Sequence, residues 1–177
     1  MNSPLERYSR PLALSRTVLR ALIKLNVLVG FLILTLLIAS LVAGGPVMRA
    51  LGVRATADSG TLIMGMRGIM LLGILAVPFA HVVFTRLLAI VETVEEGEPF
   101  VVGNAARLQT IAWAVLGLEL THVVVGIVAA RASAGTQKLD IHWDFSVTRS
   151  LAILLLFVLA RVFDQGARMR DELAATV

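Results

Sequence analysis

Four long apolar runs divide the chain, and short polar segments separate them. A bilayer core needs about 20 predominantly apolar residues per helix. The predicted spans cover about residues 25–47, 68–91, 111–130 and 145–163. The first run exceeds the about 7–15 apolar residues of a cleaved signal peptide, which predicts a retained anchor. We therefore expect one all-α integral membrane domain over residues 1–177, with four transmembrane helices in a bundle.

Composition agrees with a lipid environment. Hydrophobic residues make up 58% of the chain and charged residues 16%, whereas a soluble domain is about half apolar and a quarter charged. The chain contains no cysteine, which excludes disulfides, thiolate metal sites and a cysteine nucleophile. Its formal net charge is +4. Because the cations flank the apolar runs instead of forming one stripe, we expect no direct contact with nucleic acid.

The distribution of Lys and Arg predicts the orientation, because these residues collect on the cytoplasmic side of a membrane. One side carries Arg7, Arg10, Arg16, Arg20, Lys24, Arg86, Arg107, Arg161, Arg168 and Arg170. The other carries Arg49, Arg54, Arg67, Arg131, Lys138 and Arg149. The arm of residues 1–24 and the tail of residues 164–177 are thus expected in the cytoplasm. The arm has the pattern of a helix on anionic lipid, although its charges could also serve only to set topology.

The stretch from Glu95 to Leu108 is polar and rich in turn-forming residues, and it separates the second and third spans. We expect a cytoplasmic hairpin here. Gly97 can adopt the left-handed conformation that ends a helix. Pro99 then fits the first turn of the next helix, and Asn104 is an alternative N-cap for that helix.

Acidic residues of this hairpin are expected to face the basic arm and the basic C-terminal end. Glu92, Glu95, Glu96 and Glu98 could form exposed ion pairs there, each contributing about 0–1 kcal/mol. Phe100 either dips back towards the membrane in a plain turn or contributes to a docking surface for a cytoplasmic partner. The candidate docking residues are Glu95, Glu96, Gly97, Pro99, Phe100, Asn104 and Arg107.

One glutamate and two histidines fall inside the predicted spans. Glu119 and His122 are three positions apart and share a helix face near the middle of the third span, and His81 lies in the second span. Antiparallel neighbouring spans could bring the three together. Such a cluster either fixes helix packing through hydrogen bonds or forms a proton-sensing or ligand-binding site, since intramembrane acids are costly and often functional.

Residues 138–147 alternate between polar and apolar positions, which predicts a β-strand. Because a single strand is not stable alone, we expect it to pair with residues 49–57 of the other outer loop in a small extracytoplasmic hairpin or sheet. Asp140, His142 and Asp144 share one face of this strand and are a weak candidate for a divalent metal. The sequence otherwise predicts no metal site and no cofactor.

The stretch from Glu96 to Trp113, with its Glu-Gly-Glu-Pro-Phe start, and the run from Phe145 to Val177 resemble the bacterial membrane family catalogued as domain of unknown function 2975. The resemblance implies a four-span inner-membrane protein with cytoplasmic ends. It also suggests a helix-turn-helix transcription regulator as a cytoplasmic partner. The first span is generic, and the resemblance supplies no catalytic residues.

Enzyme signatures such as a P-loop, HExxH or GxSxG are absent from the sequence. We therefore expect a non-enzymatic membrane protein that acts as a regulatory or sensory partner of a cytoplasmic protein. The alternative is a small oligomeric proton-coupled transporter that uses Glu119. Membrane lipids and a second copy of the chain are further expected partners.

Overall fold

The computed structural model describes residues 4–50, 59–97, 101–132 and 147–174, and every element in these ranges is helical. The helices are α1 (Pro4–Val42), α2 (Gly44–Ala50), α3 (Ser59–Glu95), α4 (Val102–Ala132) and α5 (Val147–Ala174). The helical fold class is confirmed. Residues 51–57 and 138–146, where most of the predicted sheet falls, lie outside the described residues.

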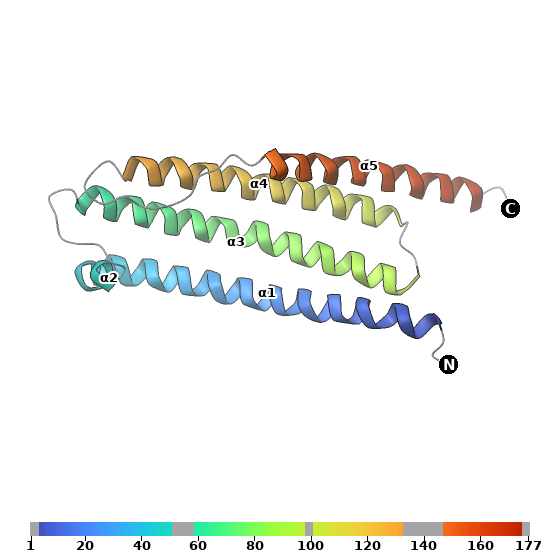
Figure 1. Ribbon diagram of the computed structural model, residues 1–177, viewed down its shortest axis with the longest axis horizontal. Helices are drawn as coiled ribbons and strands as arrows, with labels where there is room; N and C mark the ends of the chain where they lie inside the picture. The colour runs from blue at the N-terminus through green and yellow to red at the C-terminus, as the bar shows by residue number, and fades with distance from the viewer. Residues whose placement is uncertain (1–3, 51–58, 98–100, 133–146, 175–177) are drawn as a thin grey trace. The chain divides into compact units, whose positions relative to one another are not determined.

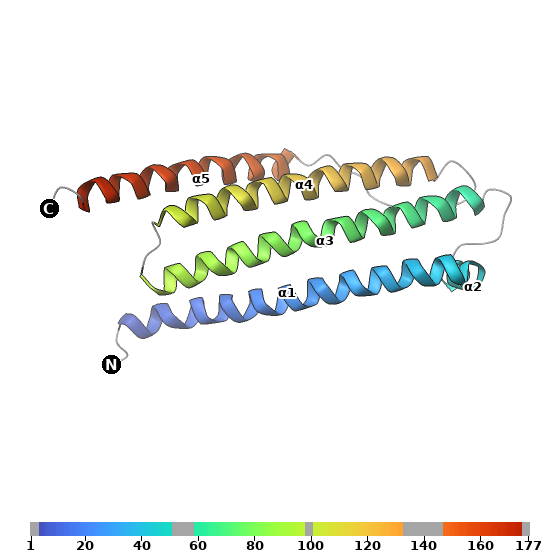
Figure 2. The same ribbon diagram turned by 180° about the vertical axis from the view of Figure 1, so that it is seen from behind.

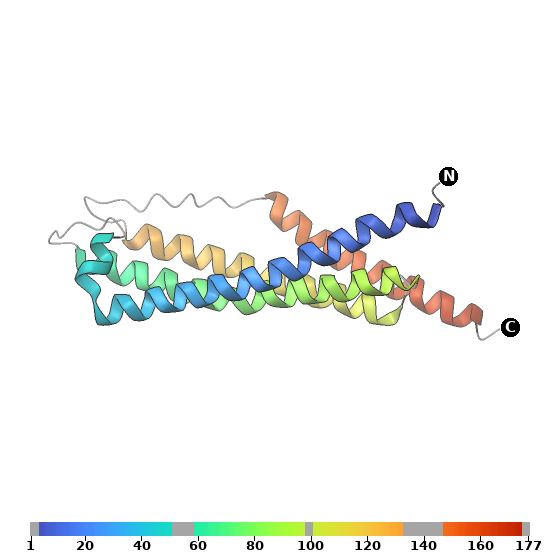
Figure 3. The same ribbon diagram turned by 90° about the horizontal axis from the view of Figure 1, so that it is seen from below.

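Two parts of the predicted sheet are wrong. Arg49 and Ala50 belong to α2, and Val147 is the first residue of α5. Residues 145–147 were shared between the predicted strand and the predicted fourth span, and at Val147 the helix prevails because the following apolar run extends into it. The predicted first span also ends early: α1 stops at Val42, and α2 runs across its axis (Figures 1 and 3).

Pro46 explains this break between α1 and α2. A proline has no backbone N–H and clashes with the carbonyl four residues earlier, which here is that of Val42. Proline is nevertheless tolerated in the first turn of a helix, where Pro46 lies in α2. The arm and the first span, by contrast, form one uninterrupted helix of 39 residues.

Three helices are long and apolar enough to cross a membrane, over Leu12–Val42, Gly60–Glu95 and Gly103–Ala132. Their large apolar side chains are widely exposed, as at Phe31 (65%) and Val42 (83%). An apolar exposed surface of this extent is expected when the surrounding medium is lipid. The chain is therefore a multi-pass membrane protein.

The fourth predicted span coincides with α5, which is not among the candidate spans found in the described residues. The uncharged run between Arg149 and Arg161 is far shorter than the about 20 residues that a bilayer core requires. Arg161 and Asp164 interrupt the apolar pattern there, so α5 is a helix of partly apolar character.

The helices divide into two compact units. The first unit contains residues 1–26, 79–116 and 146–177. Its four helical segments lie in the order α1, α3, α4, α5 (Figures 1 and 2). The α4–α5 contact includes an edge-to-face pair of Trp113 and Phe157, with ring centroids 5.2 Å apart. Leu108, Ile111 and Ala112 are buried in this unit.

The second unit contains residues 27–78 and 117–145. Here α3 packs against both α1 and α4, and glycines on α3 allow a close approach. A Cβ added at Gly65 would lie 2.3 Å from the Cβ of Ala132, and one added at Gly73 would lie 3.5 Å from Ile33. Small residues at helix contacts are typical of membrane proteins, where packing replaces the hydrophobic effect between helices.

Candidate functional site at the α3–α4 turn

The turn between α3 and α4 begins as the sequence predicts. Gly97 has a φ of +82°, which is the left-handed region that glycine enters without a steric penalty. Its N–H donates to the carbonyl of Val94 at 3.1 Å, and the N–H of Glu96 donates to that of Glu92 at 3.1 Å. These bonds satisfy carbonyls that the end of α3 would leave unpaired. Gly97 therefore ends α3 as a C-terminal cap.

Asn104 has a different role from the predicted N-cap. The helix α4 begins two residues earlier at Val102, and the N–H of Asn104 already donates to the carbonyl of Val101 at 2.9 Å. The Asn104 side chain is fully buried. Its amide nitrogen donates to the Thr93 hydroxyl at 2.8 Å, and that hydroxyl donates to the carbonyl of Ile90 at 2.8 Å. Asn104 thus joins α4 to α3.

Arg107 completes this polar contact. Its guanidinium donates to the Asn104 amide oxygen at 2.8 Å and to the Ala89 carbonyl at 3.1 Å. We call Thr93, Asn104 and Arg107 the polar clasp. Buried polar groups are costly unless hydrogen-bonded, and here Asn104 and Arg107 of α4 donate to Thr93 and to the Ala89 carbonyl of α3. The clasp fixes the start of α4 against the end of α3. Asn104 and Arg107 fall in the predicted hairpin, whereas the part played by Thr93 was not predicted.

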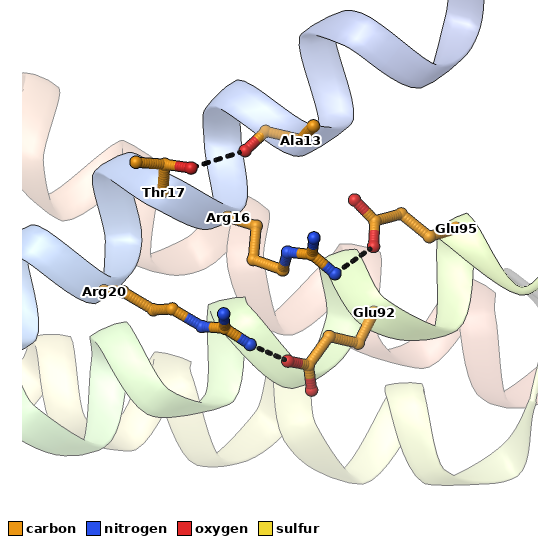
Figure 4. Close-up of polar contacts among 6 residues, drawn as sticks. All are labelled: Ala13, Arg16, Thr17, Arg20, Glu92 and Glu95. Atoms are coloured by element: carbon orange, nitrogen blue, oxygen red, sulfur yellow. Dashed lines mark hydrogen bonds and ion pairs between the residues drawn. The ribbon is translucent and has the colours of Figure 1, made fainter.

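Two ion pairs hold α1 against the same end of α3, as Figure 4 shows. Arg16 lies 3.2 Å from the Glu95 carboxylate, and Arg20 lies 3.5 Å from that of Glu92. The predicted pairing of the basic arm with the acidic hairpin is therefore observed for these residues. One turn of α1 separates the two arginines, and one turn of α3 separates the two glutamates, so the pairs follow the helix period.

Of the remaining candidate docking residues, the structure describes Glu96 but not Pro99 or Phe100. Glu96 is exposed at the start of the turn. Pro99 and Phe100 lie outside the described residues, and α4 begins at Val102. The turn is thus anchored by the ion pairs to α1 and by the clasp to α4, with an acidic residue exposed at its start.

The predicted intramembrane cluster is divided between the two units: His81 lies in the first, and Glu119 and His122 lie in the second. On α4, the Nε2 atom of His122 is buried and has no hydrogen-bond partner among the described residues. Whether all three side chains act together stays a prediction.

Another polar contact in the second unit was not predicted. The Arg67 guanidinium donates to the Ser40 hydroxyl at 3.0 Å and to the Ser40 carbonyl at 2.5 Å, and Ser40 is fully buried. This carbonyl is among the last four of α1, which lack regular intrahelical partners. Arg67 therefore caps α1, whereas the sequence indicated only a topology-setting charge.

Metal ligation finds no support in the described part of the chain, where no group of three His, Cys, Asp or Glu residues could hold a metal ion. The weak candidate set Asp140, His142 and Asp144 lies outside that part.

A family model described as "Protein of unknown function (DUF2975)" matches residues 68–177, more than half of the chain. The chain belongs to this family. The DUF2975 match covers α3 from Gly68 onwards, including Thr93, together with the turn, α4 and α5. It excludes α1, in keeping with the generic character of the first span. No curated protein and no solved structure matches the chain.

Proposed function

We propose that this DUF2975 protein is a non-enzymatic regulatory component of the bacterial inner membrane. In this proposal the α3–α4 turn docks a cytoplasmic protein such as a helix-turn-helix transcription regulator. The observation that carries the proposal is the anchoring of one short turn from two sides, by the ion pairs to α1 and by the polar clasp. A docking segment whose flanking helix ends are held in place loses less conformational entropy when a partner binds.

The charges of the first unit support the cytoplasmic placement of the turn. This unit contains the arm, the turn and the tail together, and these segments carry the larger share of the basic residues. The proposed topology has four spans, with both termini and the turn in the cytoplasm. It requires α5 to cross the membrane despite its charges, with Arg161 extending towards the interface.

Capture of partners from native membranes tests the docking role. Tagged full-length protein is cross-linked in cells, purified, and compared with a Glu96→Ala/Phe100→Ala variant that leaves the ion pairs and the clasp intact. We expect the parent to retain a cytoplasmic DNA-binding protein and the variant to lose it at equal membrane abundance. Arg49→Ala, which removes an exposed charge from α2, is the control that should retain it. Equal capture by both variants would refute the docking surface.

A second candidate function is proton-coupled transport through an oligomer, with Glu119 as the proton carrier. It is favoured by the buried, unpartnered Nε2 of His122 one helical turn from Glu119, because intramembrane ionisable residues often form proton relays. Proteoliposomes containing Glu119→Gln should lose proton-driven uptake, while Glu172→Gln in α5 should retain it. Absence of flux in the parent protein would eliminate this candidate.

A further inference from the structure

A groove of about 340 Å³ lies between α4 and α5, inside the first unit. Its α4 side is formed by Ala105, Ala106 and Gln109, and its α5 side extends from Phe157 to Arg168. The small alanine side chains leave space between two helices that are otherwise in contact through Trp113 and Phe157. The two helices lie side by side in Figures 1 and 2.

One end of the groove is cationic. Arg161 and Arg168 are two helical turns apart and share a face of α5. Both contact Asp164 between them, at 3.7 Å and 3.3 Å. The two arginine side chains are 74% and 70% exposed, so these ion pairs compete with solvent. Each guanidinium has five N–H donors, and a single carboxylate leaves most of them available to another anion.

The other end of the groove is apolar. Phe157 lines it, and its ring packs against Trp113 on α4. Residues 105–109 fall in the first two turns of the candidate span Gly103–Ala132. The groove therefore begins where that span begins, at the depth of lipid head groups, and its two ends match the two parts of a phospholipid.

We propose that this groove binds one anionic phospholipid, with its phosphate between Arg161 and Arg168 and the start of an acyl chain along Phe157. Guanidinium groups match phosphate geometry bidentately, and basic pockets between membrane helices are suited to anionic head groups. A head group that carries its own ammonium, such as ethanolamine, would face two arginines and only one carboxylate, so its positive charge would be repelled. The net positive charge therefore favours a glycerol-type head group. This site depends on membrane insertion and not on the docking role of the turn.

Native mass spectrometry of the delipidated full-length protein in detergent tests this site. Dioleoyl phosphatidylglycerol is titrated against dioleoyl phosphatidylethanolamine. We expect one phosphatidylglycerol to bind with a preference of at least about fivefold, and we expect Arg161→Gln/Arg168→Gln to abolish it, since each basic residue near an anionic surface contributes about a fivefold effect. Arg170→Gln, the same charge change on the same helix outside the groove lining, should retain the preference.

A charge-neutral variant separates the groove from general surface charge. Ala106 is an exposed residue of the lining, so Ala106→Leu fills the groove without disturbing the core or any arginine. We expect Ala106→Leu to weaken phosphatidylglycerol binding. If the double arginine variant unfolds, this variant alone tests whether the lipid occupies the groove. Binding by Ala106→Leu equal to that of the parent, or equal affinity of the parent for both lipids, would overturn the proposal. So would displacement by glycerol 3-phosphate as effective as that by the lipid.

Discussion

Arg16 in α1 and Glu95 in α3 are 79 positions apart in the chain, and their charged groups lie 3.2 Å apart. The pair, repeated one turn further along by Arg20 and Glu92, connects the N-terminal arm to the α3–α4 turn. A surface ion pair contributes little to stability by itself. Its importance here is that it specifies which side of the arm faces α3.

Exchanging the two charges should preserve this contact. Arg16→Glu places two carboxylates together and should lower the unfolding free energy, and Arg16→Glu/Glu95→Arg should recover it. We expect a coupling free energy of about 0.2–1 kcal/mol that decreases in high salt, measured by thermal unfolding in detergent. The control is the same double-mutant cycle with Arg86→Glu in place of Arg16→Glu. Arg86 is an exposed arginine of α3, and this cycle should show no coupling with Glu95→Arg. Equal coupling in both cycles would mean that Arg16 and Glu95 do not pair.

Removing the Asn104 amide should destabilise the turn more strongly. Asn104→Ala removes the amide that Thr93 and Arg107 share, so that each keeps only its bond to an α3 carbonyl, and a buried hydrogen-bonding group that loses its partner costs about 1–3 kcal/mol. For a chain of this length we expect the melting temperature to fall by several degrees. Thr110→Ala is the control, because the Thr110 hydroxyl bonds the Ala106 carbonyl of its own helix. A change no larger than that of the control would contradict the role of the clasp.

Gly97 should not tolerate a side chain, although the described residues leave space for one. A Cβ there would meet no atom within 4 Å, so the penalty comes only from the positive φ, at about 1–2 kcal/mol. Gly97→Ala should therefore lower the unfolding free energy by roughly this amount. Gly103→Ala, in equally open space within α4, should be neutral or slightly stabilising. Denaturation of both variants in detergent measures the difference, and identical stabilities would argue against the left-handed cap.

A side chain at Gly65 should destabilise the protein for the opposite reason. The backbone conformation of Gly65 is ordinary, but the space that a Cβ would need is occupied. A Cβ would lie 2.3 Å from that of Ala132, so Gly65→Ala must move α3 away from α4. We expect a loss of about 1–3 kcal/mol from overpacking. Gly60→Ala, near the start of the same helix with no atom within 4 Å, is the control. If Gly65→Ala were as stable as Gly60→Ala, the two helices would not make this close contact.

The crossing of α5 can be measured directly, because the chain has no cysteine and each introduced thiol is unique. Glu96→Cys, Thr148→Cys and Met169→Cys place single thiols at exposed positions. In intact spheroplasts, we expect an impermeant maleimide to label only Thr148→Cys, and to label the other two after permeabilisation. Labelling of Thr148→Cys and Met169→Cys from the same side would show that α5 does not cross.

Sequence patterns predicted the features that depend on hydropathy averaged over a long segment or on the backbone freedom of glycine. The three long spans follow from sustained apolar runs, and the end of α3 follows from the unique freedom of Gly97. The ion pairs of the arm also followed, because charges of opposite sign were expected on the same side of the membrane.

Features that depend on where a helix begins were not predictable in the same way. Asn104 is a common N-cap residue, and only the start of α4 at Val102 turns its side chain inward towards Thr93. The contact of Arg67 with Ser40 depends on two segments meeting in space, while each residue alone resembles an ordinary flanking charge or span residue. The fourth span was predicted from the same kind of apolar run, but Arg161 and Asp164 shorten it.

The polar clasp has a consequence for the order of events during synthesis. Its bonds between α3 and α4 join residues only 11 and 18 positions apart, and short loops close at little entropic cost and quickly. The turn can therefore assemble on the ribosome as soon as residues up to Arg107 have emerged, while α5 is still untranslated. The ion pairs of α1 with Glu95 and Glu92 join residues 79 and 72 positions apart, and closing such long loops costs more entropy, so we expect the nascent chain to complete this corner before the bundle closes around it.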